Sequence, residues 1–256
     1  MTTGAHDPAI DLARLLVTAQ ETHAPLESLR PELVPADAAA AFAVQERTLG
    51  LRGQAIGGWK VGAKSLAGPI QGAPLPADRI LESGTVVRCE DYPLLGLELE
   101  IAFRFGRVFE PSPEPYPDEV VLASVTSMLA TIEIVSSRFA GWPDVDKLCQ
   151  LADLQNHGAL ACGEAVAYSA AFPFATPALA FTADGVDIVK SPVANPAGDP
   201  RRLLAWVVNH CTARGIAVEP DVVVTTGSYT GMHFASAPGT VVGEIRGLPP
   251  VRLTLV

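Results

Sequence analysis

The sequence predicts an α+β fold in which a small helical N-terminal part precedes a β-rich core. Apolar residues recur at helical spacing before residue 56, and short apolar runs separated by Gly and Pro follow from Gly57 onward. Gly and Pro number 22 each among 256 residues, which favours short elements joined by turns over a helical bundle. We therefore expect a helical part over residues 1–56 and a single β-rich unit over residues 57–256.

Two helices are expected in the N-terminal part. Asp7-Pro8 is typical of a capping residue followed by Pro at the first helical position, which predicts a helix over about 8–21. Asp37 lies where the first turn of a second helix is expected, and Gly50 and Gly53 lie near its end. This pattern predicts a helix over about 36–49.

The core is expected to hold short strands and two further helices. Acidic residues at a positive helix end predict a helix over about 117–129, and Asp199-Pro200 and Gly215 bound a second one. The predicted strands lie at 58–63, 85–88, 97–105, 131–135, 159–162, 222–226, 240–246 and 251–256.

The charge balance excludes several classes of partner. With 18 basic and 28 acidic side chains, the net charge of −10 argues against nucleic acid and anionic membranes, which require a basic surface. A metal ion or a small molecule is the better expectation. The four cysteines form no C-x-x-C pair, and residues 1–7 show no leader pattern, so we expect a reducing compartment, the cytoplasm.

Paired carboxylates are the most informative local pattern. In the alternating segment 97–103, Glu98 and Glu100 share one strand face and the apolar residues share the other. This face is either a solvated acidic surface or part of a site. Glu133 lies in a run that is apolar on both strand faces, so its carboxylate is expected to be buried. A buried carboxylate needs a structural Arg or Lys partner or a metal ion, and both alternatives stay open.

A lysine between glycines is the second candidate. Lys60 lies in the segment Gly57-Gly58-Trp59-Lys60-Val61-Gly62. Glycines allow close approach of a ligand, and a lysine drawn into an apolar pocket can act as a proton donor or oxyanion partner. The alternative is a strand lysine whose ammonium group extends into water.

In their shared order, these segments resemble the fumarylacetoacetate hydrolase superfamily, in its 2-keto-4-pentenoate hydratase and 4-oxalocrotonate decarboxylase branch. The resemblance covers most of the chain. The matching segments are Gly58–Gly62, Leu97–Phe103, Ile132–Phe139 with Trp142, Ala152-Asp153, Gly198–Pro200 with Ala205-Trp206, and Thr225–Ser228.

The resemblance implies mixed, barrel-like sheets and assembly into dimers or larger rings. It also implies Mg²⁺ or Mn²⁺ as cofactor, and a small 2-oxo or 2-hydroxydienoate as substrate. By the same resemblance, the metal ligands are Glu98, Glu100 and Glu133, the catalytic residues are Lys60 and Asp78, and the substrate-binding residues are Arg138, Asn156, Thr226 and Ser228. The segment 152–158 departs from the family pattern, so that Asn156 or His157 replaces a polar substrate contact.

The expected activity is hydration of a 2-hydroxy-2,4-dienoate to a 4-hydroxy-2-oxo acid in the catabolism of aromatic compounds. Ser228 favours the hydratases, because the decarboxylases tend to carry a second glycine there. The alternatives are a 4-oxalocrotonate-type decarboxylase, a fumarylpyruvate-type C–C hydrolase, and a non-catalytic protein that binds 2-oxo acids.

Overall fold

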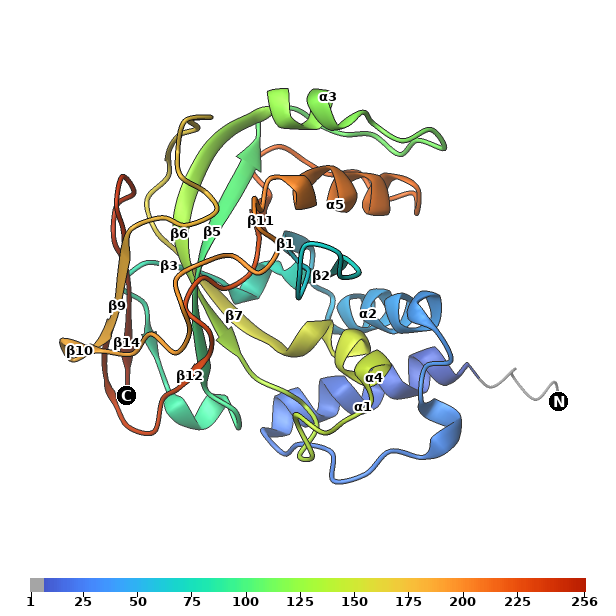
Figure 1. Ribbon diagram of the computed structural model, residues 1–256. Helices are drawn as coiled ribbons and strands as arrows, with labels where there is room; N and C mark the ends of the chain where they lie inside the picture. The colour runs from blue at the N-terminus through green and yellow to red at the C-terminus, as the bar shows by residue number, and fades with distance from the viewer. Residues whose placement is uncertain (1–6) are drawn as a thin grey trace, which may run out of the picture.

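The computed structural model describes residues 7–256. Of the residues 1–7 that were searched for a leader pattern, only Asp7 lies in the described part. Helices gather on one side of the molecule and a small sheet lies on the other (Figure 1). The helices are α1 (Pro8–Thr22), α2 (Ala38–Arg52), α3 (Asp118–Ala123), α4 (Lys147–Ala152) and α5 (Arg202–Thr212). Short 3-10 turns are η1 (Pro31–Leu33), η2 (Ala77–Arg79), η3 (Cys89–Asp91) and η4 (Leu154–Asn156).

Nine strands form a central sheet in the order β2-β1-β11-β5-β6-β7-β3, with β12 beside β5 and β8 beside β6. Its members are β1 (Ile56–Gly62), β2 (Gln71–Pro76), β3 (Ile80–Glu82), β5 (Gly96–Phe105), β6 (Val125–Val135), β7 (His157–Cys162), β8 (Val166–Ala167), β11 (Val223–Thr225) and β12 (His233–Phe234).

Five strands form a second sheet in the order β10-β9-β13-β14-β4. They are β4 (Val86–Val87), β9 (Leu179–Ala183), β10 (Val186–Asp187), β13 (Gly239–Ile245) and β14 (Val251–Leu255). This sheet packs on the apolar face of the long strands, where Leu99 and Ile101 of β5 join Val241 and Leu253 in one buried cluster.

These findings confirm the α+β class, the mixed sheets and the helical N-terminal part. Both parallel and antiparallel pairs occur, as in β1 with β11 and β5 with β6. The expectation of barrel-like sheets needs correction in one respect. Within residues 7–256 neither sheet closes, because β2 and β3 end the first path and β10 and β4 end the second.

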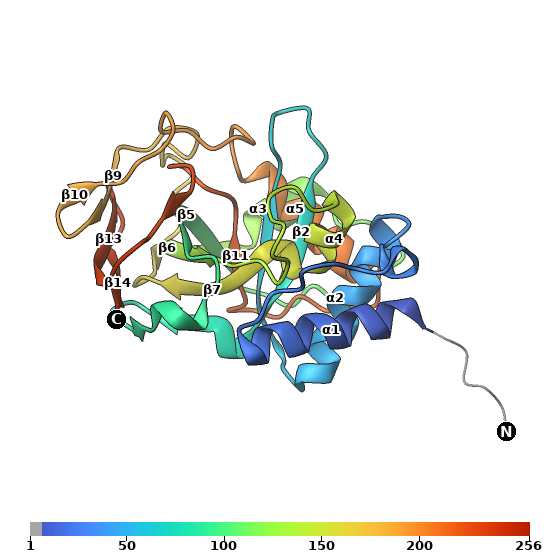
Figure 2. The same ribbon diagram turned by 90° about the horizontal axis from the view of Figure 1, so that it is seen from below.

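The N-terminal helices are held to the core by apolar packing. Leu12 and Leu16 of α1 and Val44 of α2 share a buried cluster with Phe139 and with Leu151 of α4. Figure 2 shows α1, α2 and α4 gathered on the side away from β9, β10 and β13. The division of the chain at residue 56 stays a prediction, and this cluster joins segments from both sides of it.

Candidate metal centre and active site

Strand register brings the three predicted carboxylates together. In the antiparallel pair of β5 and β6, Glu98 lies directly opposite Glu133, and Glu100 follows two residues later on the same face. One carboxylate oxygen of each lies within 4.8 Å of the others. This face is not solvated, because Glu100 is 2% exposed and Glu133 is fully buried. The reading of an exposed acidic surface is therefore wrong.

Glu133 has one committed oxygen and one free oxygen. Its Oε1 accepts a hydrogen bond from Lys60 Nζ at 2.6 Å and lies 2.9 Å from His157 Nδ1. Its buried Oε2 has no hydrogen-bond partner among residues 7–256. Burial acts to raise the pKa of Glu133, but the charge of Lys60 and the hydrogen bond from His157 outweigh it and lower the pKa below its usual range.

Lys60 reaches the carboxylates from β1, two strands away from β5. Its register partner on β11 is Thr225, which stands between Lys60 and the acidic pair. Burial acts to lower the pKa of Lys60, yet the charges of Glu133 and Glu100 raise it overall. The ammonium group therefore stays charged inside the pocket, and the reading of a water-facing lysine is wrong, since its side chain is 15% exposed.

Glu98 and Glu100 hold their protons unusually tightly. Burial and the charge of Glu133 raise the pKa of Glu98 to about 7 and that of Glu100 to about 8. The Oε2 of Glu100 accepts hydrogen bonds from the Thr225 hydroxyl and, at 2.8 Å, from the backbone N–H of Gly227. A bound cation would remove the repulsion that raises these pKa values.

The residues present fit a hard divalent cation. All candidate ligand atoms are carboxylate oxygens, the donor type that Mg²⁺ and Mn²⁺ prefer. The buried Oε2 of Glu133 has no hydrogen-bond partner among residues 7–256, so it is available as a ligand atom for a cation. The three carboxylates are therefore a candidate metal centre, and the choice of ion is left open by their chemistry.

A pocket of about 550 Å³ opens over this centre, and both apolar and polar side chains line it. Among the predicted residues, Lys60, Asn156 and Ser228 line it together with the three glutamates. Pocket-lining residues that the sequence analysis did not single out are Lys64, Gln71, Lys147, Gln150, Gln155 and Asn195. Asn195 lies in an irregular loop and donates to the carbonyls of Thr226 and Gly227, and no spacing rule marks it.

Three predicted residues do not reach this pocket. Asp78 lies on η2 at the surface, 2.5 Å from Arg52, so the structure does not bring it to the carboxylates. Thr226 is fully buried and donates its hydroxyl hydrogen to the Ile101 carbonyl. Neither side chain lines the pocket.

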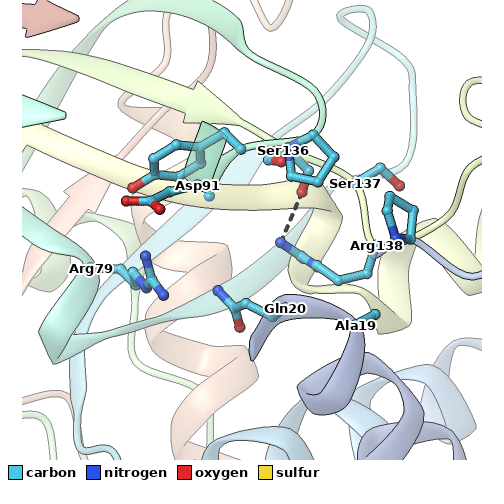
Figure 3. Close-up of a pocket in the computed structure, with 11 residues that line it drawn as sticks. Ala19, Gln20, Arg79, Asp91, Ser136, Ser137 and Arg138 are labelled. Atoms are coloured by element: carbon cyan, nitrogen blue, oxygen red, sulfur yellow. Dashed lines mark hydrogen bonds between the residues drawn. The ribbon is translucent and has the colours of Figure 1, made fainter. Parts of the chain in front are cut away.

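Arg138 is the third, and it is engaged inside the protein. It pairs with the buried carboxylate of Asp153. Figure 3 shows it with Arg79, Asp91, Ser136 and Ser137 around a separate cavity of about 20 Å³, which has room for a water molecule. The substrate contact expected of Arg138 is therefore replaced by a structural one.

His157, expected as an alternative to Asn156 for a polar substrate contact, instead contacts one of the three carboxylates. Its ring lies against Glu133, and its Nε2 is buried without a partner among the described residues. Burial is the main reason that the pKa of His157 lies below its usual value, so the ring is neutral. A lone histidine before a short apolar strand carries no signal of this contact, which depends on the β6–β7 register.

Comparison with known proteins shows that the chain is similar to enzymes of the fumarylacetoacetate hydrolase superfamily, although no family model matches it. A 2-keto-4-pentenoate hydratase from Paraburkholderia phymatum is 26% identical over 245 residues, which cover 92% of this chain and 91% of that protein. The 4-oxalocrotonate decarboxylase from Pseudomonas putida G7, complexed with magnesium and adipate, has a TM-score of 0.81 and 20% identity over 97% of both chains.

A more distant structure shares the fold over part of its length. The fumarylpyruvate hydrolase from Pseudomonas aeruginosa, in complex with Mn²⁺ and pyruvate, has a TM-score of 0.56 and 16% identity over 77% of this chain and 88% of that chain. These similar proteins are enzymes, and the structures named here hold a divalent metal ion.

Proposed function

We propose that the protein is a divalent-metal-dependent hydratase that adds water to a 2-hydroxy-2,4-dienoate and forms a 4-hydroxy-2-oxo acid. The observation that carries this proposal is the convergence of Glu98, Glu100 and Glu133 beside a charged Lys60 in one pocket. The similarity to a 2-keto-4-pentenoate hydratase over 92% of the chain supports the same reaction.

The three glutamates would hold Mg²⁺ or Mn²⁺, and the ion would supply Lewis-acid stabilisation for the enolate form of the substrate. Lys60 supports the same charge from the protein, because its ammonium group is held between Glu133 and the Gln155 carbonyl, 3.2 Å from Nζ. A lysine with a raised pKa stays protonated, so Lys60 donates hydrogen bonds and does not act as a base. Lys60 Nζ is thus placed to donate a hydrogen bond to a substrate oxygen.

Polar side chains across the pocket orient the substrate. Asn156 and Ser228 lie on the pocket lining, where their amide and hydroxyl groups can bind the carboxylate or the 2-oxo oxygen of a 2-oxo acid. The Asn156 Oδ1 is buried and has no partner among residues 7–256, so it is available to accept a hydrogen bond from a substrate hydroxyl. Assignment of Asp78 as an acid–base residue is not supported by its position.

Decarboxylation of a 2-oxo dicarboxylate is the second candidate. The similarity in fold to the 4-oxalocrotonate decarboxylase extends over 97% of both chains and favours it. Both reactions pass through the same enolate, so the carboxylates and Lys60 serve either one. Ser228, which lines the pocket, favours hydration.

Turnover of defined substrates separates the candidates. We expect purified protein with Mg²⁺ to remove the dienol absorbance of 2-hydroxypenta-2,4-dienoate and to release no CO₂. Release of CO₂ from the 4-oxalocrotonate-derived 2-oxo dicarboxylate, without dienoate hydration, would establish the decarboxylase. A Lys60→Met variant that still binds metal serves as the inactive control. Absence of turnover with both substrates, in protein that binds Mg²⁺, would favour a binding protein.

No helix within residues 7–256 has the length and apolar character needed to cross a membrane. The cytoplasmic location, the role in aromatic catabolism and assembly into a homo-oligomer stay predictions.

A further inference from the structure

Three consecutive residues beside the metal centre adopt a left-handed backbone. Leu154, Gln155 and Asn156 have φ values of 48°, 53° and 60°. None of them is glycine, and side chains disfavour this conformation because Cβ approaches the following carbonyl. Such a run persists only where the surrounding structure holds it, and backbone outliers of this kind cluster at functional sites.

The guanidinium of Arg138 holds both ends of this turn. It donates hydrogen bonds to the carbonyl oxygens of Asp153 and His157, the residues that flank the turn, and to the Asp153 carboxylate. It also donates to the Ser136 carbonyl at 2.8 Å, the contact drawn in Figure 3. Arg138 is 6% exposed and Asp153 is 1% exposed, so this clamp is shielded from water.

The turn delivers two donors to a single oxygen of Glu133. The Gln155 carbonyl accepts a hydrogen bond from Lys60 Nζ at 3.2 Å, which fixes the ammonium group beside Glu133 Oε1. His157, the next residue after the turn, places its Nδ1 2.9 Å from the same oxygen. Since Oε1 is occupied twice, Oε2 is the oxygen left for a ligand.

We infer that the Arg138 clamp and the left-handed turn 154–156 form a positioning element that holds Lys60 and His157 on Glu133 Oε1 and so reserves Oε2 for a divalent cation. Arg138, which touches neither the pocket nor the three carboxylates, is a positioning residue. The inference rests on the proposed metal centre and concerns how the chain prepares it.

A matched pair of substitutions at Gln155 tests the turn. Gln155→Gly and Gln155→Val remove the same side chain, but glycine accepts the left-handed conformation and a β-branched residue resists it. We expect Mn²⁺, titrated into each folded variant, to bind at least ~10-fold more weakly to the valine variant than to the glycine variant, the loss typical of a disturbed outer-shell contact. Equal affinities in the two variants would overturn the inference.

The role of the Arg138 clamp is tested by asking whether a second substitution restores the metal affinity that is lost when Arg138 is replaced. Arg138→Gln should weaken Mn²⁺ binding, and adding Gln155→Gly to it should restore part of the affinity, because glycine adopts the left-handed conformation without the steric cost that the clamp otherwise offsets. A purely structural ion pair predicts no such rescue.

Asp184, with a φ of 48° in the turn between β9 and β10, supplies the control pair. Asp184→Gly and Asp184→Val should differ in melting temperature and not in Mn²⁺ affinity.

The outcomes separate this inference from the proposed function. If the unmodified protein binds no Mn²⁺, the metal centre itself is wrong. If it binds Mn²⁺ and the double variant recovers nothing relative to Arg138→Gln, the positioning role is wrong while the metal centre stands. Should Arg138→Gln not fold, the Gln155 pair alone decides.

Discussion

In two of the three clustered carboxylates, one oxygen is held by hydrogen bonds from the protein. Lys60 and His157 occupy Glu133 Oε1, and the Thr225 hydroxyl and the Gly227 N–H occupy Glu100 Oε2. At Glu133 these hydrogen bonds leave Oε2 as the oxygen without a partner among residues 7–256. Outer-shell contacts of this type orient metal ligands and tune their affinity.

Glu133→Gln tests the centre with the smallest change in shape. The amide oxygen can still accept from Lys60 and His157, but the ligand charge is lost, so we expect Mg²⁺ and Mn²⁺ affinity to fall by well over ~10-fold, more than for an outer-shell residue. Isothermal titration measures the affinity. Glu244→Gln, at an exposed position of β13, is the matched control and should bind metal normally. Unchanged affinity in Glu133→Gln would contradict the three-carboxylate centre.

The roles of these residues were predictable from the sequence to different extents. Alternation placed Glu98 and Glu100 on one face, and an apolar context predicted that Glu133 is buried, both of which the structure confirms. The pairing of Glu98 with Glu133 depends on register, which one strand alone does not encode. A lysine partner and a metal ion, the two alternatives for Glu133, are compatible, because Lys60 binds one carboxylate oxygen and leaves the other without a partner among residues 7–256.

In strand β1, Gly58 and Gly62 flank Lys60 and have different structural roles. A Cβ at Gly58 would lie 2.7 Å from Cγ1 and 2.8 Å from the carbonyl oxygen of Val223, whereas a Cβ at Gly62 would have nothing within 4 Å. Gly58 therefore permits the close parallel pairing of β1 with β11, which sets the position of Lys60. Gly62 faces open space at the pocket.

We therefore expect Gly58→Ala to lower the free energy of unfolding by ~1–3 kcal/mol, because the added methyl group overpacks against Val223. Gly62→Ala should be neutral or stabilising by up to ~1 kcal/mol, since alanine restricts the unfolded chain more than glycine does. Urea denaturation of the two variants measures the difference. Equal losses at the two positions would show that the β1–β11 contact does not require glycine.

Some elements could not be predicted from local patterns. The segment Gln71–Pro76, which contains Gly and two prolines, is not among the predicted strands, yet it forms edge strand β2, where a missing N–H is tolerated. The helix expected over 117–129 ends at Ala123, and β6 begins at Val125 because this stretch pairs along the full length of β5. Tertiary pairing overrides local preference in both cases.

Over the molecule as a whole, the central sheet collects the site from segments far apart in the chain. Lys60, Glu98, Glu133 and Thr225 lie on strands β1, β5, β6 and β11, which are neighbours in the sheet. The net charge of −10 argues against polyanionic partners but does not predict this grouping. Burial of like charges at one place makes the stability of the entire fold depend on what neutralises them.

This dependence predicts opposite effects of pH and metal. Without metal, the pKa of Glu98 is raised to about 7 and that of Glu100 to about 8. Between the ordinary pKa of about 4.5 and about 8, these two groups bind more protons in the folded protein than in the unfolded chain, so their contribution to the free energy of unfolding falls as pH rises. The stabilisation is complete below about pH 4.5 and is lost as these two groups ionise. Below about pH 6.5 the lowered pKa values of His157, His210 and His233 act in the opposite direction.

A divalent cation should reverse the loss, because it replaces the protons that leave. At 100 times its dissociation constant it adds ~2.7 kcal/mol, and its effect grows with pH as competing protons are removed. Melting temperatures with EDTA and with Mg²⁺, between pH 5.5 and 8.5, measure both trends. In Glu98→Gln/Glu100→Gln the pH dependence should flatten and the Mg²⁺ effect should vanish. A Mg²⁺ shift of the same size at pH 5.5 and pH 8.5 in the unmodified protein would contradict protonation of the empty centre.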